Sequence, residues 1–440
     1  MPTHALLIVG GGAGGALVAL HALRRAPAGA RILLVEPAAT LAAGIAYATR
    51  WPEHLLNVPA GRMSAFPDAP GDFVAALAED GHADPDHLAH VYAPRRDYGA
   101  YLRARLSAAR AASAARFEVV HGRAVALDPA TGGIVLDDGR RFEGDTVALA
   151  LGNAPRRLRA DGVQAVEAWD YDAIRGIPVD ARVAIVGAGL SMVDALLSLD
   201  ATGHRGPVEV LSRHALLPRP HAAHGPAFAA DLDALLALPG VRARTRLLRR
   251  WVEAAAAQGL PWQAVMEALR PHVQRLWRTL GAAEQRRFLR HAVRHWDVHR
   301  HRIAPEVHAT VQAAIDAGRV RLHRGRALAI ARDAGGLRIE TGAGPLRADV
   351  VVNATGVESA AARMRNPLLD DLLARGAARP GPHGIGVDTD AEGALLDAAG
   401  TPQPRVRVAG SLRIGTLWES LAVPELRVQA AAIAAHAFPG

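Results

Sequence analysis

The stretch LLIVGGGAGGALVALHAL, residues 6–23, decides the fold. A short apolar run leads into Gly10, Gly12, Gly14 and Gly15, and an Ala- and Leu-rich run of helical length follows. Glycines spaced as G-x-G-x-x-G between a strand and a helix are typical of a turn around a dinucleotide pyrophosphate. They permit a tight turn, a close approach of the backbone to the phosphates, and close packing of helix on strand. The N-terminus of the helix then offers free N–H groups to the phosphates.

An acidic residue follows this turn at the expected distance. The next apolar run, RILLVE, ends in Glu36. A carboxylate at the end of the second strand accepts the ribose hydroxyls and disfavours a ribose that carries a 2′-phosphate. The sequence therefore predicts that FAD or NAD binds here and that NADP does not. The alternative is a glycine-rich core helix, and Glu36 argues against it.

A second turn of the same kind occurs in RVAIVGAGLSMVDALLSL, residues 182–199. Gly187 and Gly189 take the first two glycine positions, Ser191 lies within the turn, and Met192 stands where the third glycine would fall. The turn is therefore a looser copy of the first, and it predicts a second dinucleotide site.

The end of the following strand indicates which nucleotide this second site takes. The run PVEVLSR ends in Ser212 and Arg213 instead of an acid. A hydroxyl and a guanidinium suit a ribose 2′-phosphate, so NADPH is expected. Alternatively, Arg213 is a solvated surface arginine, and the sequence leaves that reading open.

Composition excludes several classes of protein. The chain of 440 residues contains no Cys and no Lys, so disulfide scaffolds, dithiol relays and lysine Schiff-base chemistry are excluded. The net charge is +8, but the charges are spread along the chain, and no nucleic-acid partner is expected. No run of residues is long and apolar enough to span a bilayer, so no membrane association and a cytoplasmic location are expected.

The pattern of strands and helices predicts an α/β protein with two dinucleotide-binding Rossmann-like domains and a helical insertion. We expect an FAD-binding domain whose first part covers residues 1–175 and whose C-terminal return covers 357–440. An NAD(P)H-binding domain is expected over 176–356, with the helical insertion at 226–318. The run Gly152–Pro155 is interpreted as a crossing point between domains.

The order of these features resembles the two-dinucleotide-binding flavoproteins, particularly the class B flavin monooxygenases, which include flavin-containing and N-hydroxylating enzymes. Within them the chain is most similar to a bacterial FAD/NAD(P)-binding group with the motifs G-x-A-Y and H-L-L-N-V-P-A. These motifs stand here at Gly44–Tyr47 and His54–Ala60. The similarity extends to Phe66-Pro67-Asp68, Tyr98-Gly99, Leu217-Pro218-Arg219, Trp296-Asp297 and Gly415–Ser420.

The resemblance implies a role for Asn57. In flavin-containing monooxygenases a similar Asn, followed by Met and a Phe-Pro-Asp run, lies against the flavin ring. Asn57 is therefore expected to be the catalytic residue and to contact FAD and NADPH, because a neutral amide both donates and accepts hydrogen bonds without titrating. The alternative is a structural Asx-turn before Pro59.

The remaining cofactor-binding residues are expected along the whole chain. Gly410 and Gly415 precede a closing helix that is predicted to begin near Leu417. The expected set is completed by Tyr47, Met63, Arg95, Val125, Gly152, Thr355, Gly356 and Thr416. No metal site is expected from His221 and His224, which lack a third ligand at suitable spacing. The run His299–Arg302 is either an anion-binding cluster or a polar helix end.

The implied function is an FAD-dependent oxidoreductase. NADPH would reduce FAD, and dioxygen would then form a flavin hydroperoxide that oxygenates a nitrogen or sulfur atom of a small metabolite. Alternatives are an FAD/NAD(P)H dehydrogenase or reductase without oxygen transfer, and a non-enzymatic flavin-binding redox sensor. The substrate, the general acid or base and the oligomeric state do not follow from the sequence.

Overall fold

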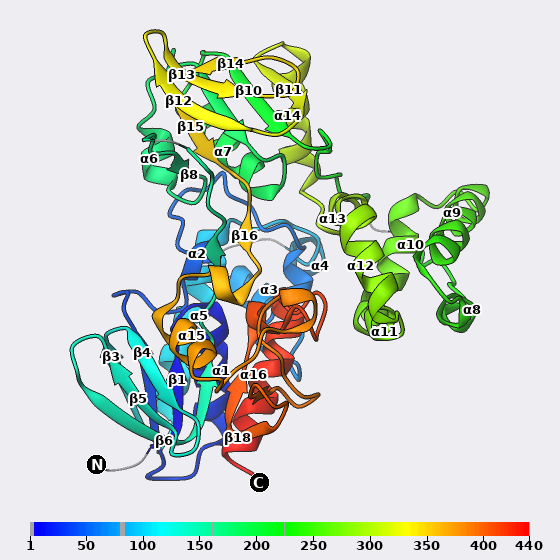
Figure 1. Cartoon of the computed structure of the whole chain (residues 1–440). Coiled ribbons are helices and arrows are strands. Elements are labelled where there is room, and N and C mark those ends of the chain that lie inside the picture. Colours follow the sequence, from blue (N-terminus) through cyan, green and yellow to red (C-terminus); the bar gives the residue numbers. More distant parts are fainter. Residues whose placement is uncertain (1–3, 80–83, 161, 224, 440) are drawn as a thin grey trace. The chain divides into compact units, whose positions relative to one another are not determined.

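The computed structural model describes residues 4–79, 84–160, 162–223 and 225–439. The chain divides into two compact units (Figure 1). The first unit consists of Met1–Pro52, Pro59–Ala154 and Glu358–Gly440, and the second consists of Glu53–Val58 and Pro155–Val357. Both units contain parallel strands and helices, which confirms the predicted α/β class with two Rossmann-like domains.

The first unit is built on a sheet in the order β17-β18-β6-β1-β2-β3. Its central strands β6, β1, β2 and β3 are parallel. The strand bounds are β1 (His4–Val9), β2 (Arg31–Glu36), β3 (Arg116–His121), β6 (Arg141–Leu149), β17 (Ala394–Leu396) and β18 (Pro402–Val408). The hairpin β4 (Ala124–Asp128) and β5 (Gly133–Leu136) joins the sheet through β6. A parallel sheet of this order needs helices on its faces.

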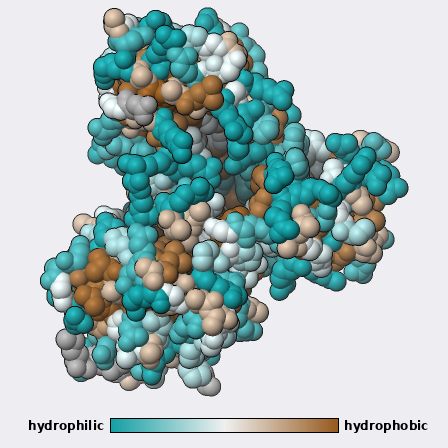
Figure 2. All heavy atoms as spheres, viewed as in Figure 1, coloured by the Kyte–Doolittle hydropathy of each residue, from teal (hydrophilic) through white to brown (hydrophobic). Residues whose placement is uncertain are grey.

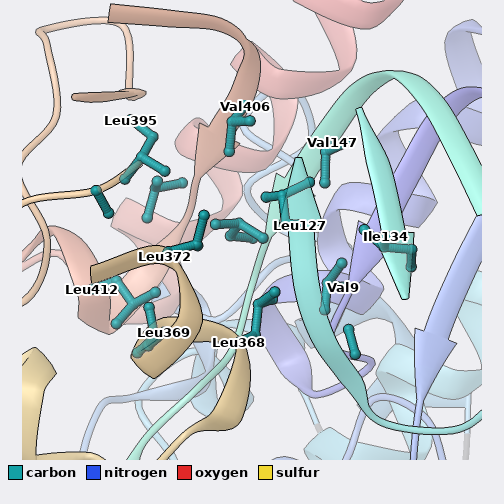
Figure 3. Packing of buried hydrophobic residues seen from close by; sticks show 14 of the residues in the cluster. Val9, Leu127, Ile134, Val147, Leu368, Leu369, Leu372, Leu395, Val406 and Leu412 are labelled. Atoms are coloured by element: carbon teal, nitrogen blue, oxygen red, sulfur yellow. The ribbon is translucent and has the colours of Figure 1, made fainter. Parts of the chain in front are cut away.

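Helices cover the sheet of the first unit because its strands are apolar on both faces. Leu6, Leu7, Ile8 and Val9 of β1 are all buried. Successive side chains of a strand point to opposite faces, so Leu7 and Val9 share one face. There they join a cluster with Leu368, Leu369 and Leu372 of α15 (Pro367–Ala374) (Figure 3). Elsewhere α1 (Ala13–Arg25) packs on α16 (Val423–Ala437) and α5 (Arg95–Ala112).

The second unit repeats this plan. Its sheet has the order β11-β10-β9-β15-β8, with every neighbouring pair parallel. The bounds are β8 (Val166–Glu167), β9 (Val183–Val186), β10 (Val208–Ser212), β11 (Val320–Arg324) and β15 (Val350–Asn353). In each unit antiparallel strands come just before a later parallel strand, which is β6 in the first unit and β15 in the second. In the second unit these antiparallel strands are β12 (Ala329–Asp333), β13 (Gly336–Glu340) and β14 (Leu346–Ala348).

The helical insertion lies between β10 and β11, and it is shorter than residues 226–318. It comprises α8 (Leu232–Ala237), α9 (Val241–Ala257), α10 (Trp262–Leu269), α11 (Val273–Arg278), α12 (Ala282–His291) and α13 (Val293–Arg300). Its own core contains Phe228, Trp251 and Leu269. The next helix, α14 (Pro305–Asp316), packs instead on α7 (Leu190–Ala201) and leads into β11. Its apolar face therefore belongs to the Rossmann-like core.

Two further boundaries differ from the sequence-based expectation. The chain passes from the first unit to the second after Ala154, at the crossing point Gly152–Pro155, and not at residue 175. The residues up to 175 include β8, which pairs with β15, so they belong to the second unit. The closing helix α16 begins at Val423 instead of near Leu417, with Pro424 in its first turn, and Gly410–Arg413 form a separate 3-10 turn.

Hydrophilic residues cover much of the visible face, and apolar residues form scattered patches on it (Figure 2). Among the described residues, no helix combines the length and the apolar character that crossing a membrane requires.

Two of the buried histidines have a pKa below the ordinary value. His21 on α1 is 8% exposed, and His204, which follows α7, is 5% exposed. Burial removes water from the charged imidazolium and lowers the pKa of both side chains below the usual 6.5. Around His204 the carboxylate of Asp180 partly opposes this shift, and Arg319 adds to it.

We expect the free energy of unfolding to fall as the pH drops below about 6.5, the ordinary histidine pKa. The unfolded chain then binds protons that buried His21 and His204 do not bind, at a cost of up to about 1.4 kcal/mol per pH unit for each group. Denaturant unfolding of His204→Gln between pH 7 and pH 5 should show a shallower dependence, and exposed His301→Gln should not. Equal slopes for all three proteins would contradict this account.

Candidate nucleotide-binding sites

The first glycine turn is fixed by a close approach of two strand ends. Gly10 has φ +103°, and a Cβ placed on it would lie 2.3 Å from the carbonyl oxygen of Ala150, just beyond β6. Its N–H donates to the carbonyl of Val35 on β2 at 2.8 Å. At the third glycine, a Cβ on Gly15 would lie 1.7 Å from the carbonyl oxygen of Gly10. The turn therefore requires glycine at both positions.

The second turn has the same geometry. Gly187 has φ +118°, a Cβ on it would lie 2.0 Å from the carbonyl oxygen of Ala354, and its N–H donates to Leu211 at 2.9 Å. Gly187, Ala354 and Leu211 thus correspond to Gly10, Ala150 and Val35 of the first unit. Met192 occupies the third position and is fully buried in α7. This helix carries a side chain where α1 has only hydrogen.

Both turns present an uncapped helix N-terminus. Gly12 precedes α1 and Gly189 precedes α7; both have extended backbone and no side chain to cap the helix. A Cβ on Gly189 would meet open space, and one on Gly12 would be in ordinary contact with Gly44 at 3.5 Å. The first N–H groups of a helix lack intrahelical acceptors and carry the positive end of the helix dipole. Each turn can therefore take an anionic phosphate.

Glu36 is held beside the first turn by backbone donors. It ends β2, and its two carboxylate oxygens accept from the N–H groups of Gly11 at 2.5 Å and Ala38 at 2.9 Å. A carboxylate has about four lone-pair sites, so these bonds orient the group and leave acceptor capacity for hydroxyl donors. This arrangement suits an unphosphorylated ribose.

In the second unit the position of Glu36 is taken by Ser212. Val35 and Leu211 bind the first glycine of their turns, and Glu36 and Ser212 are the next residues. The hydroxyl oxygen of Ser212 accepts from the N–H of Ala215 at 3.0 Å, so its own proton is available to donate. The two sites therefore share a backbone but differ in charge where the ribose would lie.

Arg213 follows Ser212 and lies in a cluster of cations. Partial burial lowers the pKa of Arg213, and nearby Arg294, Arg326 and Arg156 lower it further. Burial, Arg213 and His295 likewise lower the pKa of His214. A bound anion would relieve this repulsion. The cluster favours the 2′-phosphate interpretation over an isolated surface arginine.

Sequence reasoning missed most of this cluster. Arg326 comes just after β11, and the carboxyl ends of adjacent parallel strands lie along one edge, so its approach to Arg213 was open to prediction. Arg294 lies on α13 of the insertion. Its proximity depends on how that insertion folds back. At its base the N–H of Arg219 donates to the carbonyl of Val298, and the N–H of Ile303 donates to the carbonyl of Arg219. No local sequence signal reports that contact.

Predicted residues of the first unit gather around the strand ends and around α5. Tyr47 ends α2 (Gly44–Tyr47), and its ring centroid lies 4.7 Å from that of Tyr98 on α5. Burial raises the pKa of Tyr47 to about 12, and Arg95 at the start of α5 opposes that shift. Gly152 follows β6 with φ +71°, and its carbonyl accepts from the hydroxyl of Ser411 at 2.5 Å.

The other predicted residues of this unit have structural contacts. Val125 lies on β4, and Met63 is buried after a short 3-10 turn. Gly410 donates its N–H to the side chain of Gln429 at 3.0 Å. A Cβ on Gly415 would lie 2.3 Å from a backbone oxygen, so the chain packs closely there. The hydroxyl of Thr416 donates to Asp388 at 3.2 Å.

Thr355 and Gly356 lie in the second unit, at the place that corresponds to Leu151 and Gly152. Gly356 has φ +87°, and its carbonyl accepts from the N–H of Arg156 at 2.9 Å. The hydroxyl of Thr355 lies 2.7 Å from the side-chain oxygen of Asn353 and 3.2 Å from the carbonyl of Arg156. Ser191 on α7 accepts from the indole of Trp169 at 3.2 Å. These residues surround the second turn.

Asn57 and Met63 are placed in different units. Asn57 belongs with the second unit, and its carbonyl accepts from Nε2–H of His221 at 3.0 Å. Met63 belongs with the first unit. The expected single FAD-binding stretch over residues 1–175 is therefore divided between Val58 and Pro59.

The run His299–Arg302 contributes to the helical insertion. Arg302 is 3% exposed, forms an ion pair with Glu267 and lies over the ring of Trp262. His299 contacts Trp262 edge-on, with ring centroids 4.9 Å apart. Within the described residues, no three His, Asp or Glu side chains gather as a metal site would require.

Comparison with known proteins identifies the architecture. Residues 7–154 match the model of the FAD-NAD(P)-binding family. The chain has 17% identity and a TM-score of 0.65 with ornithine N-hydroxylase from Kutzneria sp. 744, over 98% of both chains. The fold is that of the N-hydroxylating flavin monooxygenases. The resemblance drawn from the sequence motifs is thus confirmed at the level of the fold.

Two other monooxygenases have the same fold. L-lysine 6-monooxygenase from Pseudomonas syringae has 16% identity and a TM-score of 0.63 over 99% of both chains. Cadaverine monooxygenase from Erwinia amylovora, solved with FAD bound, has 12% identity and a TM-score of 0.62 over 99% of this chain and 95% of its own. No curated protein sequence matches the chain.

Gly15→Ala should destabilise the first unit by about 1–3 kcal/mol or more, the cost of forcing a methyl group into a packed site. Gly14→Ala is the matched control, because its Cβ would be 3.9 Å from its nearest neighbour. Thermal unfolding and the flavin absorbance of the purified proteins measure the effect. Equal stability of the two variants would show that α1 does not pack as described.

Arg213→Ala should reduce the preference for NADPH over NADH by about tenfold or more, since a hydrogen bond to a charged group contributes about 1.5–3 kcal/mol. Arg205→Ala is the control, because Arg205 is exposed and pairs with Asp180 away from the turn. The ratio of the two dissociation constants, measured by titration, tests this. An unchanged ratio in Arg213→Ala would show that Arg213 is a solvated surface arginine that does not bind the 2′-phosphate.

Proposed function

We propose that the protein is an FAD-dependent monooxygenase that is reduced by NADPH and oxygenates a nitrogen atom of a small amine. The observation that carries this proposal is the pair of glycine turns, equal in backbone geometry and opposite in charge at the strand end. Glu36 suits the unphosphorylated ribose of FAD, and Ser212 with Arg213 suits the 2′-phosphate of NADPH.

The residues of the first turn fit FAD. Gly10–Gly15 leave backbone and the N-terminus of α1 for a pyrophosphate, and Glu36 retains acceptor capacity for a ribose. When bound, FAD supplies the chemistry of accepting a hydride from NADPH and activating dioxygen. The protein's own contribution is to bind and orient the two nucleotides and the substrate, and to exclude water from them.

The similar structures support the proposed substrate class. The ornithine, lysine and cadaverine enzymes have names that refer to aliphatic amines, and all share this fold over nearly the whole chain. A primary amine at the end of an aliphatic chain is therefore the substrate class that we propose first. The sulfur substrates that were also expected from the sequence have no counterpart among these three enzymes.

Asn57 is proposed as the neutral amide that faces the reacting atoms. An amide donates and accepts hydrogen bonds at any working pH, because it does not titrate. Its carbonyl group is fixed by His221. This support comes from the backbone of Asn57, and the function of its side chain rests on the resemblance to flavin-containing monooxygenases.

The test is anaerobic reduction of the yellow protein by NADPH and by NADH, followed by admission of oxygen together with ornithine, lysine or cadaverine. We expect faster reduction by NADPH and a hydroxylamine product. Reduction without any oxygenated product, with all electrons recovered as hydrogen peroxide or water, would favour the reductase or oxidase alternative. A purified protein that takes up no FAD would end the proposal.

Asn57→Ala should bind FAD and be reduced by NADPH at the normal rate, but its yield of oxygenated product per NADPH should fall about tenfold or more, as for loss of one preorganised donor. Asn366→Ala is a control, since the side chain of Asn366 caps α15 in the first unit. Product and hydrogen peroxide are measured together. A coupling ratio that stays at the wild-type value would assign Asn57 a structural role.

A further inference from the structure

We infer that the peptide Glu53–Val58 is a docked part of the second unit, and that His54, His221 and Arg175 are positioning residues that hold Asn57 fixed relative to the second glycine turn. The importance of Asn57 rests on the proposed function. The docking itself rests on contacts within the second unit.

The central anchor is a buried histidine. The side chain of His54 is 0% exposed, and its Nε2 lies 2.9 Å from the hydroxyl oxygen of Ser198 on α7. Its ring lies against Tyr171 of α6 (Tyr171–Arg175), with ring centroids 4.1 Å apart. Releasing this imidazole would leave buried polar groups without partners, which costs more than the bond itself contributes.

Two further contacts hold the ends of the peptide. At one end, Glu53 pairs with Arg175 at 2.5 Å, and both side chains are about four-fifths buried, at 17% and 20% exposed. At the other end, the carbonyl of Asn57 accepts from His221 at 3.0 Å. Between them Leu56 is 3% exposed. The peptide is therefore fixed at both ends and in the middle.

The surface that receives the peptide also forms the second turn. Helix α7 begins at Leu190, directly after Gly189, and Ser198 lies about 12 Å along it at 1.5 Å per residue. Near its start, Ser191 accepts from Trp169. One rigid helix thus connects the turn to the His54 anchor. Asn57 follows this anchored histidine by three residues and is itself held by His221.

The pattern of contacts changes at Pro59. Beyond it, the N–H of Ala60 donates to Val91 at 2.9 Å, and the N–H of Gly61 donates to Ala89 at 2.9 Å. The carbonyl of Ser64 accepts from Arg427 of α16 at 2.9 Å. All of these partners belong to the first unit. The chain therefore passes from the second unit to the first between Val58 and Pro59. Asn57 belongs to the second unit, which carries the second glycine turn.

Hydrogen exchange of the FAD-loaded protein tests this inference. We expect His221→Ala to accelerate amide exchange in residues 53–58 by about tenfold, the effect of one lost hydrogen bond, and to leave the turn at 10–15 unchanged. His221→Gln should restore protection, because its amide can donate to the same carbonyl. Arg427→Ala is the matched control, because it removes the bond to Ser64 and should accelerate exchange in 60–66 and not in 53–58.

Titration with NADP⁺ gives a second readout. Ligand binding protects amides that open together with the unit that binds it. We expect NADP⁺ to slow exchange in residues 53–58 together with 183–199, and not in 60–66. Exchange of 53–58 that follows 60–66 under NADP⁺, or that is unaffected by His221→Ala, would overturn the inference.

These outcomes are separate from failure of the proposed function. If NADP⁺ protects no part of the chain, the assigned nucleotide is wrong, and the His221 and Arg427 variants still decide whether the peptide is docked on the second unit. If docking is confirmed but His221→Ala leaves the ratio of product to NADPH unchanged while Asn57→Ala lowers it, the positioning role is refuted and the function stands.

Discussion

The architecture depends on a close approach between a glycine turn and the end of a neighbouring strand, which occurs once in each unit. At Gly10 and at Gly187 the backbone turns with positive φ so near to the end of the neighbouring strand that a Cβ would lie 2.3 Å or 2.0 Å from a carbonyl oxygen. Only glycine satisfies this geometry. It brings the carboxyl ends of three parallel strands to one edge, where an uncapped helix N-terminus also begins.

On this shared frame, the difference between the two sites lies in a few side chains. The first strand end carries Glu36, oriented by two backbone N–H groups. The second carries Ser212 and Arg213, and partial burial and neighbouring arginines lower the pKa of Arg213. In the function proposed above, charge at a single strand end selects between two nucleotides of similar shape. The backbone of each turn would bind the pyrophosphate, which the two nucleotides have in common.

The sequence predicts those features that depend on residues close together in the chain. The glycine turns, Glu36, Ser212 and the helical insertion were all evident because spacing and periodicity act over neighbouring residues. The approach of Arg294 to Arg213, and the transfer of Asn57 to the second unit, were not evident. Both depend on contacts between residues far apart in the chain, such as His54 with Ser198 and His221 with Asn57. The roles of the individual site residues remain predictions.

The excursion of Glu53–Val58 into the second unit has a consequence for how such a chain can be divided or recombined. A cut after Ala154 leaves this peptide attached to one half while the surface that buries His54 and Leu56 remains in the other. One half would then expose the apolar side chains of the peptide to water, and the other half would expose the surface that covers them. Exchange of one nucleotide domain between relatives should succeed only when the six-residue peptide is exchanged along with it.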